Sequence, residues 1–315
     1  MQTIQIATFL LSIAVVLTSL GQAKSAEPEV IRLWPDVAPG SEDYPKQEKF
    51  DSRKPADGNG WVTGVSEPTL TVYQPHDSHH VGSGVVICPG GAYSGLSIEK
   101  EGFALAEWFA ERGVVVGVLK YRHGGGPHQH PIPLNDAQRA MRIMRSKADG
   151  WKIDASKIGI AGFSAGGHLA STTGTHYDQG KADSEDAIET FSCKPNYMVL
   201  VYPVISMQNG LTHDGSRNKL LGKSPDEDSV KLLSNELQVT TETCPTFITH
   251  CADDKTVSVE NAVAFYQALR THKVPVEMHL YETGGHGYGF FRGNRSADRW
   301  PDLLDPWLKR QGLID

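Results

Sequence analysis

The chain has 315 residues, of which 39% are hydrophobic and 21% charged, and its formal net charge at pH 7 is -7. The composition is that of an ordinary globular protein, and the length suits one large α/β domain after removal of a leader, or two small ones. A nucleic-acid partner is not expected, because binding to a polyanion needs clustered lysines and arginines.

Residues 1–23 have the pattern of a signal peptide. The stretch from Ile4 to Leu20 is mostly apolar and carries no charge, and Gly21-Gln22-Ala23 offers a cleavage site among small residues. The alternative is a membrane anchor, but the run is short for a span and no basic stop-transfer cluster follows it. We therefore expect cleavage and export to a secreted or periplasmic location, with no stable membrane anchor.

An N-terminal arm, residues 24–60, is expected to precede a main domain, residues 61–315. The arm is rich in proline, glycine and charge, with one short expected strand from Val30 to Leu33. Beyond it, apolar runs typical of strands alternate with runs of helical period. The expected strands are 69–73, 84–88, 114–121, 158–161, 197–205, 246–251 and 276–281. The expected helices are 101–112, 134–147, 167–171, 259–269 and 297–310.

This alternation predicts an α/β fold: a doubly wound, mainly parallel sheet with helices on both faces. Between the strands 197–205 and 246–251 lies a polar segment, Met207 to Thr240, with weak helical patterning at 229–237. Its position after a strand end suggests a small cap or lid over the C-terminal edge of the sheet.

Export would permit disulfides among the four cysteines. Cys244 and Cys251 lie at opposite ends of one expected strand, roughly 20 Å apart, which is too far for a bridge. Cys193 and Cys244 each precede one of two consecutive strands, so they could meet at one edge of the sheet. A Cys193–Cys244 bridge is predicted on this basis, and the alternative is four buried or free thiols.

Neither a metal nor an organic cofactor is indicated. No Cys-x-x-Cys pair appears, and His76, His79 and His80 share a loop tip with no partner cluster nearby.

The segment Gly162-Phe163-Ser164-Ala165-Gly166 fits the pattern G-x-S-x-G. It follows an apolar strand and precedes a helix-forming run, the context in which this pattern holds a serine on a strained turn. Glycines at both ends remove the Cβ atoms that would clash there. Because glycine, serine and alanine are common, the pentapeptide alone could be an ordinary βα turn. Ser164 is the candidate nucleophile.

A serine hydroxyl becomes a good nucleophile only beside a base, and the base needs an orienting carboxylate. His286 is the candidate base, because glycines on both sides leave its imidazole free to approach Ser164. His168, just after Ser164, is expected to pack against the sheet, and His250, inside a strand, is expected to be structural. An ordinary loop histidine is the alternative for His286.

Asp253 and Asp254 compete for the role of the carboxylate. Both follow the strand 246–251, so they should lie at the same sheet edge as Ser164 and His286, in the expected order Ser, Asp, His. Asp254 is preferred, because the acid usually lies one step beyond such a strand end. Asp253 could instead cap a turn or helix.

Acyl transfer also needs N–H donors for the oxyanion that develops on the substrate. One should come from Ala165, next to the nucleophile, and another from the loop Pro89-Gly90-Gly91-Ala92, where small residues expose the backbone. Gly91 is preferred there, with Ala92 as a helper, and a plain Gly-Gly turn is the alternative.

Together these segments resemble the α/β-hydrolase superfamily, and within it the secreted carbohydrate-esterase-like group called acetyl xylan esterase or BD-FAE-type feruloyl esterase. The resemblance runs from about Pro68 to the C-terminus and implies Ser164 as nucleophile, Asp254 as acid and His286 as base. Ala92 departs from the third glycine of His-Gly-Gly-Gly found in many relatives. The motifs are Cys88-Pro89-Gly90-Gly91-Ala92-Tyr93, Leu119-Lys120-Tyr121-Arg122, His130-Pro131-Ile132-Pro133-Leu134-Asn135-Asp136-Ala137, Gly162 to Ala170, His250 to Val257 and Gly284 to Gly289.

The resemblance implies a serine carboxylester hydrolase that deacetylates or deacylates plant or algal polysaccharide through an acyl-enzyme, with an acylated carbohydrate or other small ester as its substrate. A serine exopeptidase, or a general short-chain esterase or lipase on the same fold, is the alternative. A decayed, non-enzymatic binding protein is disfavoured because all three triad residue types are present. Relatives have also been named xylanase, but a glycosidase would need two facing carboxylates.

Overall fold

The computed structural model describes residues 27–44, 47–51, 60–75, 79–124, 126–290, 293 and 295–315. The expected signal peptide, residues 1–23, lies outside these ranges. Within them, no helix has the length and apolar character needed to cross a membrane.

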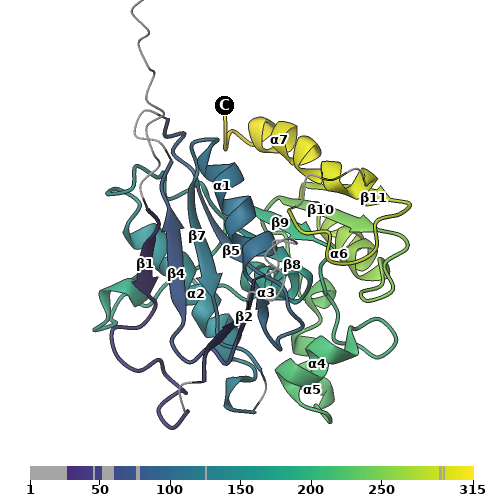
Figure 1. Cartoon of the computed structure of the whole chain (residues 1–315), viewed down its shortest axis with the longest axis horizontal. Helices are drawn as coiled ribbons and strands as arrows, with labels where there is room; N and C mark the ends of the chain where they lie inside the picture. The colour runs from purple at the N-terminus through teal and green to yellow at the C-terminus, as the bar shows by residue number, and fades with distance from the viewer. Residues whose placement is uncertain are drawn as a thin grey trace, which may run out of the picture.

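A twisted eight-stranded sheet forms the centre of the molecule (Figure 1). Its strands, in spatial order, are β1 (Glu29–Arg32), β4 (Thr69–Tyr73), β7 (Val115–Lys120), β5 (Gly84–Cys88), β8 (Ile158–Phe163), β9 (Met198–Val201), β10 (Thr246–Cys251) and β11 (Val276–Tyr281). Every pair from β7 to β11 in this order is parallel, whereas β4 pairs antiparallel with both β1 and β7. The prediction of a mainly parallel, doubly wound sheet is confirmed.

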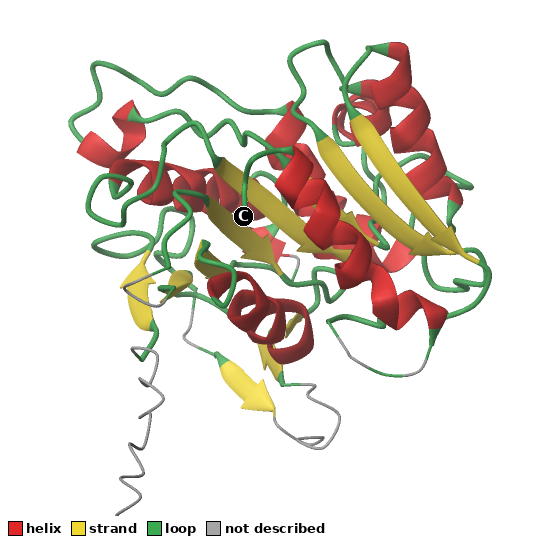
Figure 2. Cartoon of the chain, turned by 90° about the horizontal axis from the view of Figure 1, so that it is seen from above, coloured by secondary structure: helices red, strands yellow, loops and turns green. Residues whose placement is uncertain are grey.

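Helices cover both faces of this sheet (Figure 2). One face carries α2 (Ile132–Ser146), α3 (Ser164–Thr175) and α6 (Glu260–Thr271), and the other carries α1 (Ala104–Ala110) and α7 (Trp300–Arg310). In α2, the apolar residues Ala137, Met141 and Met144 recur at helical spacing and are fully buried. On the opposite face, Arg112, just beyond α1, forms an ion pair at 2.8 Å with Asp305 of α7.

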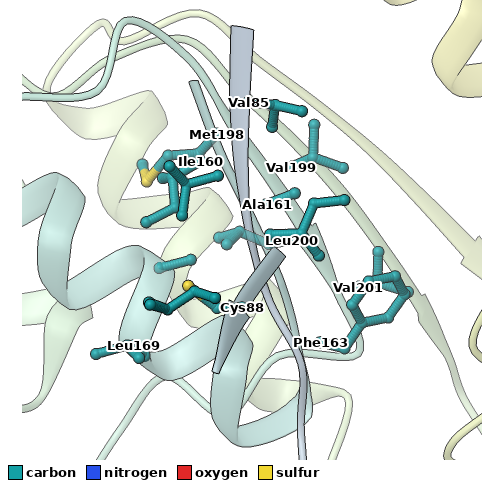
Figure 3. Close-up of a cluster of buried hydrophobic side chains, with 14 of the residues drawn as sticks. Val85, Cys88, Ile160, Ala161, Phe163, Leu169, Met198, Val199, Leu200 and Val201 are labelled. Atoms are coloured by element: carbon teal, nitrogen blue, oxygen red, sulfur yellow. The ribbon is translucent and has the colours of Figure 1, made fainter. Parts of the chain in front are cut away.

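The core lies around the three central strands β5, β8 and β9, which are buried along their whole length. Figure 3 shows Ile160 of β8 beside Met198 of β9, and Phe163 of β8 beside Val201 of β9. Because both faces of these strands are covered, their sequences are continuous apolar runs with little alternation. Ser164 directly follows β8, so the tightly packed centre of the sheet holds its backbone rigidly.

A small antiparallel sheet, which the sequence did not indicate, joins β2 (Lys49–Asp51), β3 (Trp61–Thr63) and β6 (Leu96–Ser97). The segment that precedes β2 forms partly buried hydrogen bonds with residues of the helix α2 and of the loop before it. Trp34 donates from Nε1 to Asp136 Oδ1 at 3.1 Å, and Arg122 donates to the Pro39 carbonyl oxygen at 2.6 Å. The Arg122–Asp136 ion pair beneath it is completely buried, at 2.7 Å.

Two expectations are wrong. The strand expected at 197–205 ends at Val201, because Tyr202 adopts a left-handed φ of 37° and the Val204 N–H donates to the Ser164 carbonyl oxygen instead. The Cys193–Cys244 bridge is also absent: both cysteines are free and buried, as are Cys88 and Cys251. The Cys193 sulfur instead accepts a hydrogen bond from the Asp178 N–H at 3.2 Å, in the loop that follows α3.

Candidate active site

Ser164 lies on a sharp turn between β8 and α3, where it is the first residue of the helix. Its φ is 53°, a left-handed conformation that costs a non-glycine residue energy. The turn is so tight that a Cβ on Gly162 would collide with the Gly166 carbonyl oxygen. The chain therefore presents a mostly buried serine hydroxyl at the C-terminal end of the central strand, in strained geometry.

Three side chains from separate loops form one hydrogen-bonded chain. Ser164 Oγ lies 2.9 Å from His286 Nε2, and His286 Nδ1 lies 2.7 Å from Asp254 Oδ2. Asp254 follows β10 and His286 follows β11, and these strands pair in parallel with Cys251 opposite Tyr281. The parallel register brings the two loops to the same edge of the sheet as Ser164.

The Asp254 carboxylate is held in its ionised form. Its Oδ1 accepts from the Thr256 and Val257 N–H groups, each at 2.9 Å, while Oδ2 accepts from His286 and from His250 Nε2, the latter at 3.0 Å. Burial raises the pKa of this carboxyl, but the hydrogen bonds from His250 and His286 outweigh burial and leave the pKa well below its usual range. In a neutral His286, Nδ1 therefore carries the proton and Nε2 is free to accept from Ser164.

Asp253 has a different position from its neighbour. Its Oδ1 accepts a hydrogen bond from the Gly285 N–H at 2.8 Å, whereas the hydrogen bond of His286 Nδ1 goes to Asp254. Of the two candidate carboxylates, the structure brings Asp254 to His286, while Asp253 holds the backbone one residue before it.

The loop after β5 adjoins the serine. A Cβ on Gly90 would lie 2.9 Å from the Ser164 Cβ, so only glycine fits there. Gly91 has a φ of 143° and Ala92 a φ of 55°, and within the described part of the chain their N–H groups have no hydrogen-bond acceptor. Ala165, as an early residue of α3, likewise has an N–H without an intrahelical partner. These N–H groups can donate hydrogen bonds to a negatively charged oxygen.

The other two histidines are structural in their contacts. His168 Nδ1 lies 2.9 Å from Tyr93 Oη, and His168 Nε2 lies 2.8 Å from the Leu233 carbonyl oxygen. Burial lowers the pKa of His168 to about 4, so the ring is neutral near pH 7. Neutral His168 donates to Leu233 and accepts from Tyr93, which links the loop after β5 to the segment 207–240. His250 supports Asp254, as described above.

The segment 207–240 forms α4 (Asp214–Leu221), α5 (Glu227–Leu232) and a short turn at Asn235–Leu237. Figure 1 shows α4 and α5 at the end of the molecule opposite the C-terminus. His213 caps α4 by accepting from the Ser216 N–H at 3.3 Å. Burial lowers the pKa of His213, and the charge of His286 lowers it further.

Sequence reasoning missed Glu101 and Tyr202. Glu101 is almost fully buried, and its oxygens accept from the Gly90 N–H at 2.8 Å and from Tyr202 Oη at 2.9 Å. One signal was present: Glu101 shares the apolar helical face of Leu105 and Phe109, where an acidic residue is unexpected. In the described ranges, no group of three or more His, Cys, Asp or Glu residues could hold a metal ion.

The BD-FAE family matches residues 70–269 of the chain. An acetylxylan esterase of Xylanibacter ruminicola is 34% identical over 233 residues, which cover 72% of this chain and 45% of that protein. Endo-1,4-beta-xylanase B of Butyrivibrio fibrisolvens is 35% identical over 205 residues, 64% of this chain and 32% of that one. This chain therefore spans less than half the length of these two curated relatives.

Among solved structures, the acetyl ester-xyloside bifunctional hydrolase from Caldicellulosiruptor lactoaceticus is 37% identical with a TM-score of 0.77. The match covers 91% of this chain and 97% of that one, so the two share the whole architecture. The match to the family over more than half of the chain, together with this likeness, confirms the resemblance seen in the sequence: the chain belongs to the BD-FAE family and has the α/β-hydrolase fold.

Proposed function

We propose that this protein is a serine carboxylester hydrolase that removes acetyl or similar small acyl groups from plant or algal polysaccharide. The observation that carries the proposal is the hydrogen-bonded chain Ser164–His286–Asp254 at the C-terminal edge of a parallel sheet. The substrate class is supported by relatives named acetylxylan esterase and acetyl ester-xyloside hydrolase.

In the first half-reaction, Ser164 Oγ attacks the ester carbonyl carbon while its proton moves to His286 Nε2. The carbonyl oxygen becomes an oxyanion, for which we assign the N–H groups of Ala165 and Gly91, with Ala92 as helper. The bond to the sugar oxygen then breaks, and His286 returns the proton to that oxygen. The products are a free sugar hydroxyl and an acyl group on Ser164.

In the second half-reaction, water repeats these steps. His286 takes a proton from a water molecule while the oxygen of that water attacks the acyl carbonyl carbon. The same N–H groups donate hydrogen bonds to the second oxyanion. The bond to Ser164 breaks, Oγ regains the proton from His286, and the carboxylic acid leaves. Asp254 stays ionised throughout and stabilises the imidazolium in both half-reactions.

The test is acetate release from acetylated xylan by purified protein, with Ser164→Ala as the control. The proposal is supported if the wild-type protein releases acetate and the Ser164→Ala variant does not. p-Nitrophenyl acetate and an aminoacyl-naphthylamide are assayed in parallel to separate polysaccharide deacetylation from general esterase and exopeptidase activity. A folded protein that releases acetate from neither the polysaccharide nor the small ester contradicts the proposal.

We also propose that residues 1–23 direct export and are removed, which leaves the arm 24–60 and the catalytic domain 61–315 in a secreted or periplasmic enzyme. The support is the uncharged apolar stretch and the small residues that follow it. N-terminal sequencing of the exported protein should begin at about residue 24, and an intact leader on exported protein would argue for an anchor.

A further inference from the structure

Directly before α1, the chain forms one π-helical turn, Glu99–Phe103. Such turns are rare and occur often at functional sites. Here two consecutive side chains leave the turn toward different loops. Lys100 donates from Nζ to the Gly287 carbonyl oxygen at 3.0 Å, and its own carbonyl oxygen accepts from the Phe290 N–H at 2.9 Å. Lys100 thus holds the loop that carries His286.

Glu101 holds the loop on the other side of the nucleophile. Its side chain lies in the interior, with the whole residue 4% exposed, and both oxygens accept hydrogen bonds. Oε2 accepts from the Gly90 N–H at 2.8 Å, and Oε1 accepts from Tyr202 Oη at 2.9 Å. Gly90 borders Ser164 and precedes Gly91 and Ala92, so this carboxylate fixes the start of the loop assigned to the oxyanion.

Tyr202 extends the contact to His286. Its Oη donates to Glu101 and accepts from the Gly289 N–H at 2.8 Å, three residues after the imidazole. Its ring lies 4.8 Å from the His286 ring, centroid to centroid, and 4.4 Å from that of Tyr288. The fully buried tyrosine therefore contacts both the imidazole and the backbone that carries it.

We infer that Glu101 and Tyr202 are positioning residues that hold the oxyanion loop and the His286 loop in fixed relation on either side of Ser164. The inference rests on the proposed function, since it assigns a role to residues around that site. The hydrogen bonds of the two side chains join them to each other, to the Gly90 N–H and to the Gly289 N–H, and not to Ser164 or the His286 nitrogens. They act through the Gly90 N–H, the Gly289 N–H and the His286 ring, so their loss should displace donors that matter in the transition state more than in substrate binding.

Two conservative variants break this network at separate points. Tyr202→Phe keeps the ring against His286 but removes the hydroxyl that joins Glu101 to Gly289. Glu101→Gln keeps the shape, but its amide nitrogen cannot accept, so either the Gly90 or the Tyr202 contact is lost. For each variant we expect kcat to fall about 10- to 100-fold with KM within about twofold, the size of effect that a small misplacement produces.

The double variant Glu101→Gln/Tyr202→Phe should lose little more than the more affected single variant, because both residues act through one network. The matched control is Tyr197→Phe. Tyr197 is also a buried tyrosine, and its hydroxyl donates to the Gly84 carbonyl oxygen at 3.0 Å, at the opposite ends of the strands. This variant loses a hydrogen bond of the same kind and should keep kcat within about twofold of wild type, because the reacting groups do not move.

The experiment measures kcat and KM on p-nitrophenyl acetate, the rate at which a fluorophosphonate labels Ser164, and thermal unfolding. Labelling should slow in proportion to kcat, since it uses the same serine, histidine and oxyanion donors. The inference would be overturned if folded Tyr202→Phe kept the wild-type kcat, or if its kcat fell no further than that of Tyr197→Phe. It would also be overturned if the losses of kcat multiplied in the double variant. A wild-type protein that neither hydrolyses esters nor takes the label is a separate result, which refutes the proposed function itself.

Discussion

His286 Nδ1 lies 2.7 Å from Asp254 Oδ2, while the adjacent carboxylate, Asp253, binds the backbone N–H of Gly285 at 2.8 Å. Two neighbouring aspartates thus support one histidine in different ways. Asp254 fixes the tautomer and orientation of the ring, and Asp253 fixes the backbone that precedes it.

This division predicts unequal losses on substitution. Asp254→Asn should lower kcat by about four orders of magnitude, because the amide no longer holds the proton on Nδ1. Asp253→Asn keeps an oxygen that accepts from Gly285 and should cost less than about tenfold, since only the charge of that contact is lost. Ester hydrolysis by the two variants, measured side by side, decides the matter. The reverse order, with Asp253→Asn the more damaged, would contradict the assignment.

The strain at Ser164 predicts a stability difference between two inactive variants. Ser164→Ala keeps a Cβ at a φ of 53°, whereas Ser164→Gly relieves the left-handed conformation. After allowance for the greater flexibility of unfolded glycine, Ser164→Gly should be more stable than Ser164→Ala by about 0.5–1 kcal/mol. Urea unfolding of both proteins checks this. A Ser164→Ala variant that is the more stable of the two would show that the turn is not strained.

The sequence predicted the fold well where apolar runs were bounded by clear breakers. The strands 69–73, 84–88, 246–251 and 276–281 have the observed boundaries. The helix α4 was missed because its sequence, Asp214–Leu221, has little apolar period. The small sheet of β2, β3 and β6 was missed because strands of two or three residues leave no pattern to detect.

The candidate site was predictable where a local motif marks it. Ser164 and His286 stand in glycine-rich turns after strands, and their order along the chain follows from the topology of the sheet. Glu101 and Tyr202 were not predictable in the same way, because they lie 101 residues apart and meet only in the folded protein. The Cys193–Cys244 bridge failed for a related reason: adjacency of two strands does not fix which way each thiol points.

The buried His168 predicts a dependence of stability on pH. Burial lowers its pKa in the folded protein to about 4, against about 6.5 in the unfolded chain. As pH falls from 6.5, the unfolded chain takes up a proton that the folded protein does not. The free energy of unfolding therefore decreases down to about pH 4, by at most about 3 kcal/mol from this group, and levels off below.

His168→Gln, which can still donate to Leu233, should weaken this dependence, and urea unfolding between pH 7 and pH 4 measures it for both proteins. His123, whose pKa burial also lowers to about 4, contributes equally to both and cancels in the difference. Parallel curves of unfolding free energy against pH for wild type and variant would contradict this, because they would mean that the pKa of His168 is the same in the folded and the unfolded protein.

The four buried cysteines predict a simple pattern of thiol labelling. Burial raises the pKa of Cys244 to about 12, and all four thiols are free and shielded from solvent. Iodoacetamide at pH 8 should leave the native protein unlabelled within minutes and modify four cysteines after unfolding in denaturant without reductant. Mass spectrometry counts the adducts. Two adducts, with Cys193 and Cys244 linked in the peptide map, would contradict this and support the disulfide expected from the sequence.

The central claim, that His286 makes Ser164 a nucleophile, is tested most directly by the rate and site of fluorophosphonate labelling. We expect wild-type protein to be labelled at Ser164 alone, Ser164→Ala not at all, and His286→Ala at least about a thousandfold more slowly, because its serine has no base. Labelling of His286→Ala at the wild-type rate, or labelling of wild type at a residue other than Ser164, would contradict the account.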